Sequence, residues 1–96
     1  MNDLETAILE RLKSVIDPEI GLDVVQMRLV ENLRADAQGK VRYTFCPSSF
    51  VCPIAVMLAI DIKKTVAEVP SVTSQDIAIE GYLMAEELEK LINQEA

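Results

Sequence analysis

The sequence contains no histidine and only two cysteines. Without histidine the chain lacks the most common general base, any Cys-His or Ser-His-Asp pair, and the usual Cys/His zinc sites. Two thiolates do not fill a four-coordinate thiolate site, so a cysteine-only metal site needs a second chain, a partner protein or other ligands. No nucleophile–base pair is apparent, and the sequence therefore predicts a protein that is not an enzyme.

Basic residues are also scarce, with nine against sixteen acidic residues and a net charge of −7. A nucleic-acid-binding protein normally shows a basic patch, and a membrane-surface helix shows a Lys/Arg face. The longest apolar run, residues 53–60, is too short to span a bilayer, and the acidic start lacks the features of a signal peptide. We therefore expect a cytoplasmic protein that binds neither nucleic acid nor membranes, where a Cys46–Cys52 disulfide would be unusual.

The length of 96 residues, half of them apolar, predicts a single domain spanning residues 1–96 with a small core. Apolar residues recur at helical spacing in three segments and alternate with polar residues in the strand segments. The pattern predicts helices over 2–16, about 53–69 and 83–93, strands over 29–35, 40–46 and within 72–80, and a weak strand at 22–27. This order indicates a two-layer α+β fold, α-β-β-α-β-α, with a hairpin followed by a parallel strand in a small mixed sheet.

Local signals set the ends of these elements. Asn2 or Asp3 can cap the first helix, with Glu5 completing a capping box. Pro18 should end that helix at Ile16, because the residue before a proline avoids the helical region. Residues 17–21 form a turn in which Asp17 and Glu19 have either a purely local role or a role in a site.

The two cysteines lie in one loop, residues 45–55, between a predicted strand and the most apolar helix. Pro53 is typical of a first helical position, which would make Cys52 the N-cap, beside free backbone N–H groups. The helix dipole and these N–H groups would favour a thiolate there. Cys52 is therefore either a reactive or metal-ligating thiol or a small buried apolar residue.

The first two turns of this helix are apolar on all sides, which is typical of a helix that is buried or lies at an interface. Either a neighbouring helix covers the second face, or the face formed by Val56, Met57 and Ile60 is a dimer or client surface.

These residues form a recognisable pattern. Residues 15–21 (Val-Ile-Asp-Pro-Glu-Ile-Gly), followed by Val24-Val25, Leu29-Val30, Pro47-Ser48-Ser49 and Cys52-Pro53, resemble the PaaD/SufT-type iron–sulfur cluster assembly domain. The resemblance covers about residues 4–80. It implies an α+β fold and a role in maturing or delivering iron–sulfur clusters, without a well-established catalytic reaction. In this resemblance Cys52 matches the signature cysteine, and Asp17 and Glu19 match acidic turn residues thought to lie near it. The remaining neighbours of the site would be Pro18, Thr44, Pro47, Ser48, Ser49 and Pro53.

Two positions and one segment depart from the family pattern. Arg28 stands where glycine is common, and Cys46 stands where threonine is common. The segment 81–84 and a charged helix replace a C-terminal segment rich in tryptophan and proline. Client binding that depends on that segment is therefore not expected of this chain.

The leading hypothesis is an assembly or carrier protein in which Cys52 is the essential ligand and Cys46 a second one. A symmetric dimer would bring together four cysteines, enough to hold a [2Fe–2S] or [4Fe–4S] cluster transiently. Alternatively, Cys46 is an ordinary residue at the end of a strand. The partners would be the iron–sulfur assembly machinery or an apo-protein client.

A second hypothesis is a metal-free adaptor that binds such a partner through the Val56, Met57 and Ile60 face. A thiol redox protein ranks last, because the cysteine spacing is not Cys-x-x-Cys.

Overall fold

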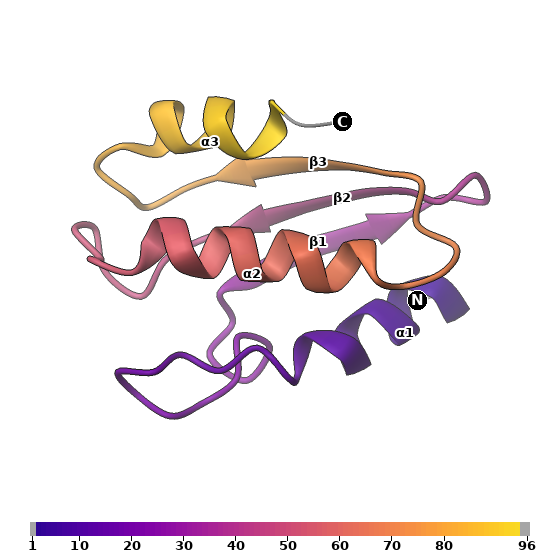
Figure 1. The fold of residues 1–96 in the computed structure, drawn as a ribbon, viewed down its shortest axis with the longest axis horizontal. Coiled ribbons are helices and arrows are strands. Elements are labelled where there is room, and N and C mark those ends of the chain that lie inside the picture. The colour runs from indigo at the N-terminus through magenta and orange to yellow at the C-terminus, as the bar shows by residue number, and fades with distance from the viewer. Residues whose placement is uncertain (1, 95–96) are drawn as a thin grey trace.

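The computed structural model describes residues 2–94, which form three helices around a three-stranded sheet (Figure 1). The elements follow the predicted α-β-β-α-β-α order. They are α1 (Asp3–Leu12), β1 (Val30–Ala35), β2 (Lys40–Phe45), α2 (Ala55–Ala67), β3 (Ser74–Ile79) and α3 (Ala85–Asn93).

The sheet has the strand order β1-β2-β3, with β1 antiparallel and β3 parallel to the central β2. This is the predicted mixed sheet. Alternation places Val41, Tyr43 and Phe45 of β2 on the buried face, as expected for a half-buried strand. Gly39 closes the hairpin at φ +81°, and a Cβ at this position would lie 2.0 Å from the carbonyl oxygen of Ser71. Only glycine therefore fits this turn.

The core lies between the sheet and the two helices α1 and α2, which also pack against each other (Figure 1). Helix α3 packs along β3. Buried apolar side chains come from every element, and the largest fully buried ones are Ile8, Leu12, Val24, Val41, Phe45, Leu58, Ile62, Val66 and Ile77. Among the described residues, no helix is both long enough and apolar enough to cross a membrane.

Helix α1 begins as predicted and ends earlier than predicted. The Asn2 side chain accepts the Glu5 N–H at 2.7 Å, and a Glu5 carboxylate oxygen accepts the Asn2 N–H at 3.2 Å, so the capping box is present. The helix ends at Leu12, because the Ser14 hydroxyl bonds the Arg11 carbonyl oxygen and the chain then leaves in turns. The expectation that the helix reaches Ile16 is wrong.

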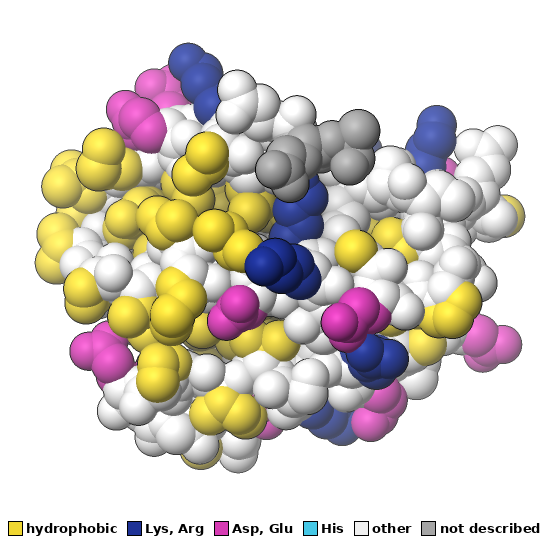
Figure 2. Space-filling view, viewed as in Figure 1, with side chains coloured by type: hydrophobic (Ala, Val, Ile, Leu, Met, Phe, Trp, Pro, Cys, Tyr) yellow, Lys and Arg dark blue, Asp and Glu magenta, His cyan; other side chains and the backbone are white. Residues whose placement is uncertain are grey.

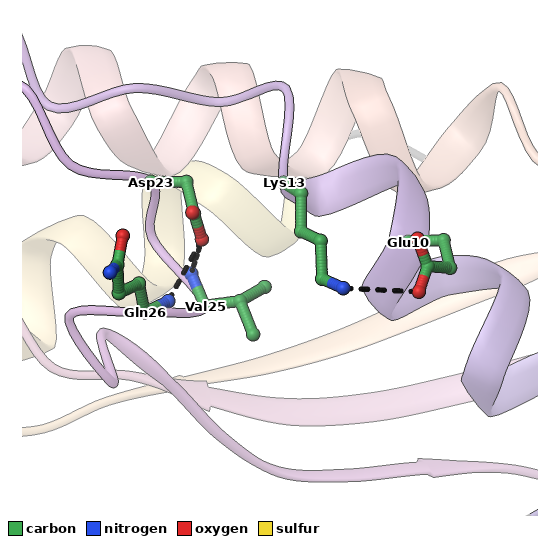
Figure 3. Close-up of polar contacts among 5 residues, drawn as sticks. All are labelled: Glu10, Lys13, Asp23, Val25 and Gln26. Atoms are coloured by element: carbon green, nitrogen blue, oxygen red, sulfur yellow. Dashed lines mark hydrogen bonds and ion pairs between the residues drawn. The ribbon is translucent and has the colours of Figure 1, made fainter.

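The weak strand expected over residues 22–27 is also wrong. The strand-type pairing described in this segment is an isolated antiparallel bridge between Asp23 and Ile16. The Asp23 carboxylate accepts the N–H groups of Val25 and Gln26, at 3.0 and 2.8 Å (Figure 3). Aspartate offers the backbone a turn in competition with a strand, and Figure 3 shows this turn near the exposed Glu10–Lys13 ion pair.

The short terminal helix is confirmed as α3, with Leu88 and Ile92 buried. Leu91 of the same helix is 51% exposed. It follows Leu88 by three residues but faces away from the core, so the apolar stripe of α3 is narrower than its sequence suggests.

Candidate functional site

The cysteine loop, defined here as residues 46–54, connects β2 to α2 and lies at one end of the molecule, on the left in Figure 1. Backbone hydrogen bonds fix both of its sides. The Cys46 N–H donates to the Leu29 carbonyl oxygen at 2.8 Å, and the Leu83 N–H donates to the Phe50 carbonyl oxygen at 2.8 Å. The loop is thus attached to the start of β1 on one side and to the segment before α3 on the other.

Cys52 is a free thiol that is 2% exposed. It is not the N-cap of α2, because the helix begins at Ala55 and its N-cap is Ile54. The backbone of Ile54 has φ −110° and ψ 13°, outside the helical region, so Pro53 belongs to a turn before the helix. The N-cap prediction is therefore wrong, and the burial of Cys52 agrees with its description as a small apolar residue.

Cys46 is a half-buried free thiol. A Cβ on Gly81, which has φ +68°, would lie 2.9 Å from the Cys46 sulfur. The Cys46 sulfur therefore occupies the space that a side chain at position 81 would need, so that only glycine fits there. Sequence reasoning missed this contact, although a cysteine and a glycine at the ends of two neighbouring parallel strands were a signal that could have suggested it.

We call residues 17–21 the acidic turn. Its first residue, Asp17, is buried, with only 1% of its surface exposed. One carboxylate oxygen, Oδ1, accepts the Glu19 N–H at 2.8 Å, and the backbone oxygen accepts the Gly21 N–H at 2.7 Å. These bonds form the local turn that the sequence offered as one interpretation. The second carboxylate oxygen, Oδ2, is buried without a hydrogen-bond partner, which is unusual for a buried polar atom.

The other residues predicted near the site lie in different settings. Pro47 is buried in the cysteine loop, whereas Ser48, Ser49 and Pro53 of the same loop are exposed. Pro18 and Glu19 are exposed in the acidic turn. Thr44 is half-buried on β2, where it alternates with the core-facing Tyr43 and Phe45 and so belongs to the outer face of the sheet.

Exposed hydrophobic residues surround the cysteine loop. Phe50 and Val51 at its tip are 58% and 66% exposed. Figure 2 shows hydrophobic side chains gathered on the left of the molecule, at the end where the acidic turn, the cysteine loop and the segment before α3 all lie in Figure 1. We call this surface the apolar end, formed by Ile20, Leu22, Phe50, Val51, Val56, Met57, Leu83 and Met84.

Of these residues, sequence reasoning identified Val56 and Met57, and it also named Ile60, which is half-buried. It missed the three loop segments, because exposed apolar residues in loops carry no periodic signal. Such a concentration on a small protein is typical of an interaction surface. A hollow of about 210 Å³ continues it between α2 and α3, lined by Val56, Tyr82, Met84, Glu87, Leu88 and Leu91.

Side chains able to bind a metal ion are spread over the molecule. Within residues 2–94, no three or more Cys, Asp or Glu side chains come together in a way that could hold a metal ion.

Comparisons with known proteins agree with this architecture. Over 76 residues, covering 79% of this chain and 74% of the relative, it is 33% identical to the Fe-S protein maturation auxiliary factor YitW of Bacillus subtilis. It is 31% identical over 65 residues to the Fe-S protein maturation auxiliary factor SufT of Staphylococcus aureus, covering 68% of this chain and 74% of that protein. A crystal structure of a domain of unknown function from Bacillus anthracis matches with a TM-score of 0.73 and 28% identity, covering 93% of this chain and 87% of that one.

A family model described as iron–sulfur cluster assembly protein matches residues 5–79, which include the acidic turn and the cysteine loop. The resemblance seen in the residue pattern is thereby confirmed, and the chain belongs to the family of iron–sulfur cluster assembly proteins.

Proposed function

We propose that this protein is a non-catalytic maturation factor that helps to assemble iron–sulfur clusters or to deliver them to apo-proteins, with Cys52 as its essential thiol. The observation that carries the proposal is that both free thiols belong to one loop, at the apolar end of the molecule. Membership of the assembly family and the names of two relatives support it. The cytoplasmic location predicted from the sequence is part of this proposal.

The burial of Cys52 requires the cysteine loop to open before its sulfur meets a metal. The tip of the loop, residues 48–51, is exposed and has no helix or strand. A partner that binds Phe50 and Val51 at the apolar end would pull on this tip and break the Leu83–Phe50 backbone bond. In this proposal partner binding therefore exposes Cys52, so that the cluster is received and released only in the complex.

The number of thiols per chain determines how many chains would be needed to hold one cluster. Iron–sulfur clusters are commonly held by four cysteine thiolates, and one chain supplies Cys46 and Cys52. A two-fold contact through the apolar end would place two cysteine loops against each other. The cluster is then a transient cargo of type [2Fe–2S] or [4Fe–4S], shared by two copies or by this chain and a partner.

Anaerobic reconstitution with iron and sulfide tests this proposal. Absorbance, iron and sulfide per chain, and mass in solution would be measured for wild type, Cys46→Ala and Cys52→Ala. We expect a cluster in a dimer for wild type and loss of the cluster in Cys52→Ala, with chemical denaturation showing that the variant still folds. A folded Cys52→Ala protein that retains the cluster would refute the assignment of Cys52.

A metal-free adaptor is the second candidate, and the burial of Cys52 together with the exposed Val56 and Met57 favours it. Cluster transfer to an apo-ferredoxin by a purified assembly system distinguishes the two. An adaptor would keep its stimulating effect in the Cys46→Ala/Cys52→Ala variant and lose it in Met57→Glu. A carrier would lose its effect in both variants.

A further inference from the structure

The sheet has a second face, opposite the core, on which residues are exposed or half-buried. Val41, Tyr43 and Phe45 of β2 point into the core. Arg42, which lies between Val41 and Tyr43 in the strand, is exposed on the opposite face. On the neighbouring strands Arg34 and Asp76 are exposed as well. This outer face takes no part in the cysteine loop or the apolar end.

Two arginines stand directly opposite each other on this face. Arg34 of β1 is the cross-strand partner of Arg42 of β2 in the antiparallel pair. Like charges in directly opposite positions destabilise a sheet. The pairing is unexpected in a chain that has nine basic residues and a net charge of −7, because acidic partners are plentiful.

A β-bulge creates this pairing. Between Glu31 and Arg34 the register shifts, so that two residues of β1, Asn32 and Leu33, lie opposite one residue of β2. In a regular strand Leu33 would stand opposite Arg42, and Arg34 would point into the core. Asn32 adopts φ +57° within the bulge, a left-handed conformation that glycine and asparagine adopt more readily than other residues. Bulges of this kind redirect side chains at binding sites.

The arginine pair borders a hollow of about 310 Å³, a size that suits a small molecule. Its lining combines two guanidinium groups with a carboxylate, an amide and a hydroxyl, and it consists of Asn32, Arg34, Arg42, Tyr43, Thr44, Asp76 and Ala78. The Arg34 guanidinium uses one N–H to donate to the Leu33 carbonyl oxygen at 2.9 Å, which leaves its other N–H groups for a ligand. Guanidinium groups bind carboxylates in a planar, bidentate geometry. We propose that this hollow binds a small dicarboxylate, whose two carboxylates engage Arg34 and Arg42.

Asp76 leaves Arg42 available and selects against compact anions. Its carboxylate lies 3.6 Å from Arg42, and the two side chains are 69% and 76% exposed, so this ion pair contributes little and is easily exchanged. Asp76 and Glu31, which is paired with Thr44, flank the arginines with negative charge. A dicarboxylate spreads its charge over two ends, whereas a phosphate concentrates it beside these carboxylates.

A titration with malonate, followed by amide and guanidinium NMR signals at constant ionic strength, tests the proposal. We expect saturable shifts at Asn32, Arg34 and Arg42, and an affinity at least about tenfold weaker in Arg34→Gln and in Arg42→Gln. Arg11→Gln is the matched control, because Arg11 lies on α1 and pairs with Glu68; its affinity should equal that of wild type. Shifts that do not saturate, or that persist in both variants, would overturn the proposal, as would equal affinity for phosphate.

A double-mutant cycle in unfolding free energy supplies a readout independent of ligand signals. Without malonate, the coupling between Arg34→Gln and Arg42→Gln should show repulsion between the two arginines. With saturating malonate, wild type should gain thermal stability and the double variant should not. A favourable coupling without ligand, or an equal gain in both proteins, would contradict the site. The assay contains no metal, so its outcome is separate from that of the proposed cluster function.

Discussion

Asn93 of α3 forms a two-way hydrogen-bond pair with the backbone of Ile77 on β3. Its Oδ1 accepts the Ile77 N–H at 2.9 Å, and its Nδ2 donates to the Ile77 carbonyl oxygen at 2.7 Å. One helical turn earlier, Glu89 accepts the Ile79 N–H at 3.1 Å. Because β3 is an edge strand, these side chains occupy backbone groups that would otherwise be open to pairing with another chain.

Replacing Asn93 by leucine should lower the free energy of unfolding by about 1–3 kcal/mol, because both Ile77 groups lose their partner. The variant should also aggregate more readily, since the edge of β3 is uncovered. Chemical denaturation and light scattering would measure the two effects. The matched control is Gln94→Leu at the exposed next position, and equal losses in both variants would show that the pairing contributes nothing.

Arg28 has φ +58°, a left-handed backbone conformation that favours glycine. Left-handed backbone is unfavourable for arginine and free for glycine. Arg28→Gly should therefore raise the free energy of unfolding, by up to about 1 kcal/mol after the greater flexibility of glycine in the unfolded chain is subtracted. Arg28→Ala, which keeps the strain, should bring no gain; if it stabilises the protein equally, the backbone conformation is not the cause.

Glu5 links the start of α1 to the end of β1, since its Oε2 accepts the Ala35 N–H at 2.8 Å. This bond and the capping-box bond to Asn2 hold the pKa of Glu5 below its ordinary value of 4.5. A lowered pKa gives stability that is complete above the ordinary value and is lost as pH falls through the folded-state pKa. The stability difference between wild type and Glu5→Gln should therefore shrink as pH is lowered from 7 to 3 in denaturation series. A difference that is constant across this range would contradict the role of the Glu5 charge.

The two thiols should react at different rates, because Cys46 is half-buried and Cys52 is 2% exposed. A thiol reagent added to the native protein should give a fast phase and a slow phase. Cys46→Ala should remove the fast phase and Cys52→Ala the slow one. If Cys52 reacts first, the cysteine loop is open in the free protein, and the proposed opening by a partner is unnecessary.

Much of this fold follows from local patterns in the sequence. The alternation of Val41, Tyr43 and Phe45 predicts β2, and Asn2 with Glu5 predicts the start of α1. These signals are reliable here because each depends on residues within a few positions of one another. The positive φ of Gly39 is a local requirement, whereas the closeness of its Cα to the Ser71 carbonyl oxygen depends on a distant segment.

Other features depend on contacts between distant segments. A proline before an apolar run is compatible with a first helical position and with a preceding turn, so Pro53 did not reveal that α2 begins at Ala55. The contact between Cys46 and Gly81 joins two strand ends far apart in sequence. The Arg34–Arg42 pairing depends on the bulge at Asn32, which alternation alone does not indicate.

Asp17 offers a final test, because its two carboxylate oxygens have different surroundings. Oδ1 accepts the Glu19 N–H, whereas Oδ2 is buried without a partner. Asp17→Ala removes the acceptor and should cost about 1–2 kcal/mol of unfolding free energy. Asp17→Asn keeps that acceptor and replaces a buried charged group by a neutral one, which is less costly to bury. It should therefore be at least as stable as wild type by chemical denaturation.

The same pair of variants shows whether Asp17 serves the site or only the fold. A stable Asp17→Asn protein that fails in cluster reconstitution would assign the charge of Asp17 to cluster handling, since the turn is intact. A stable variant that reconstitutes normally would limit Asp17 to its turn. If Asp17→Asn is as unstable as Asp17→Ala, the buried position of Oδ2 does not tolerate an amide N–H donor, and the prediction that a neutral side chain is easier to bury there is wrong.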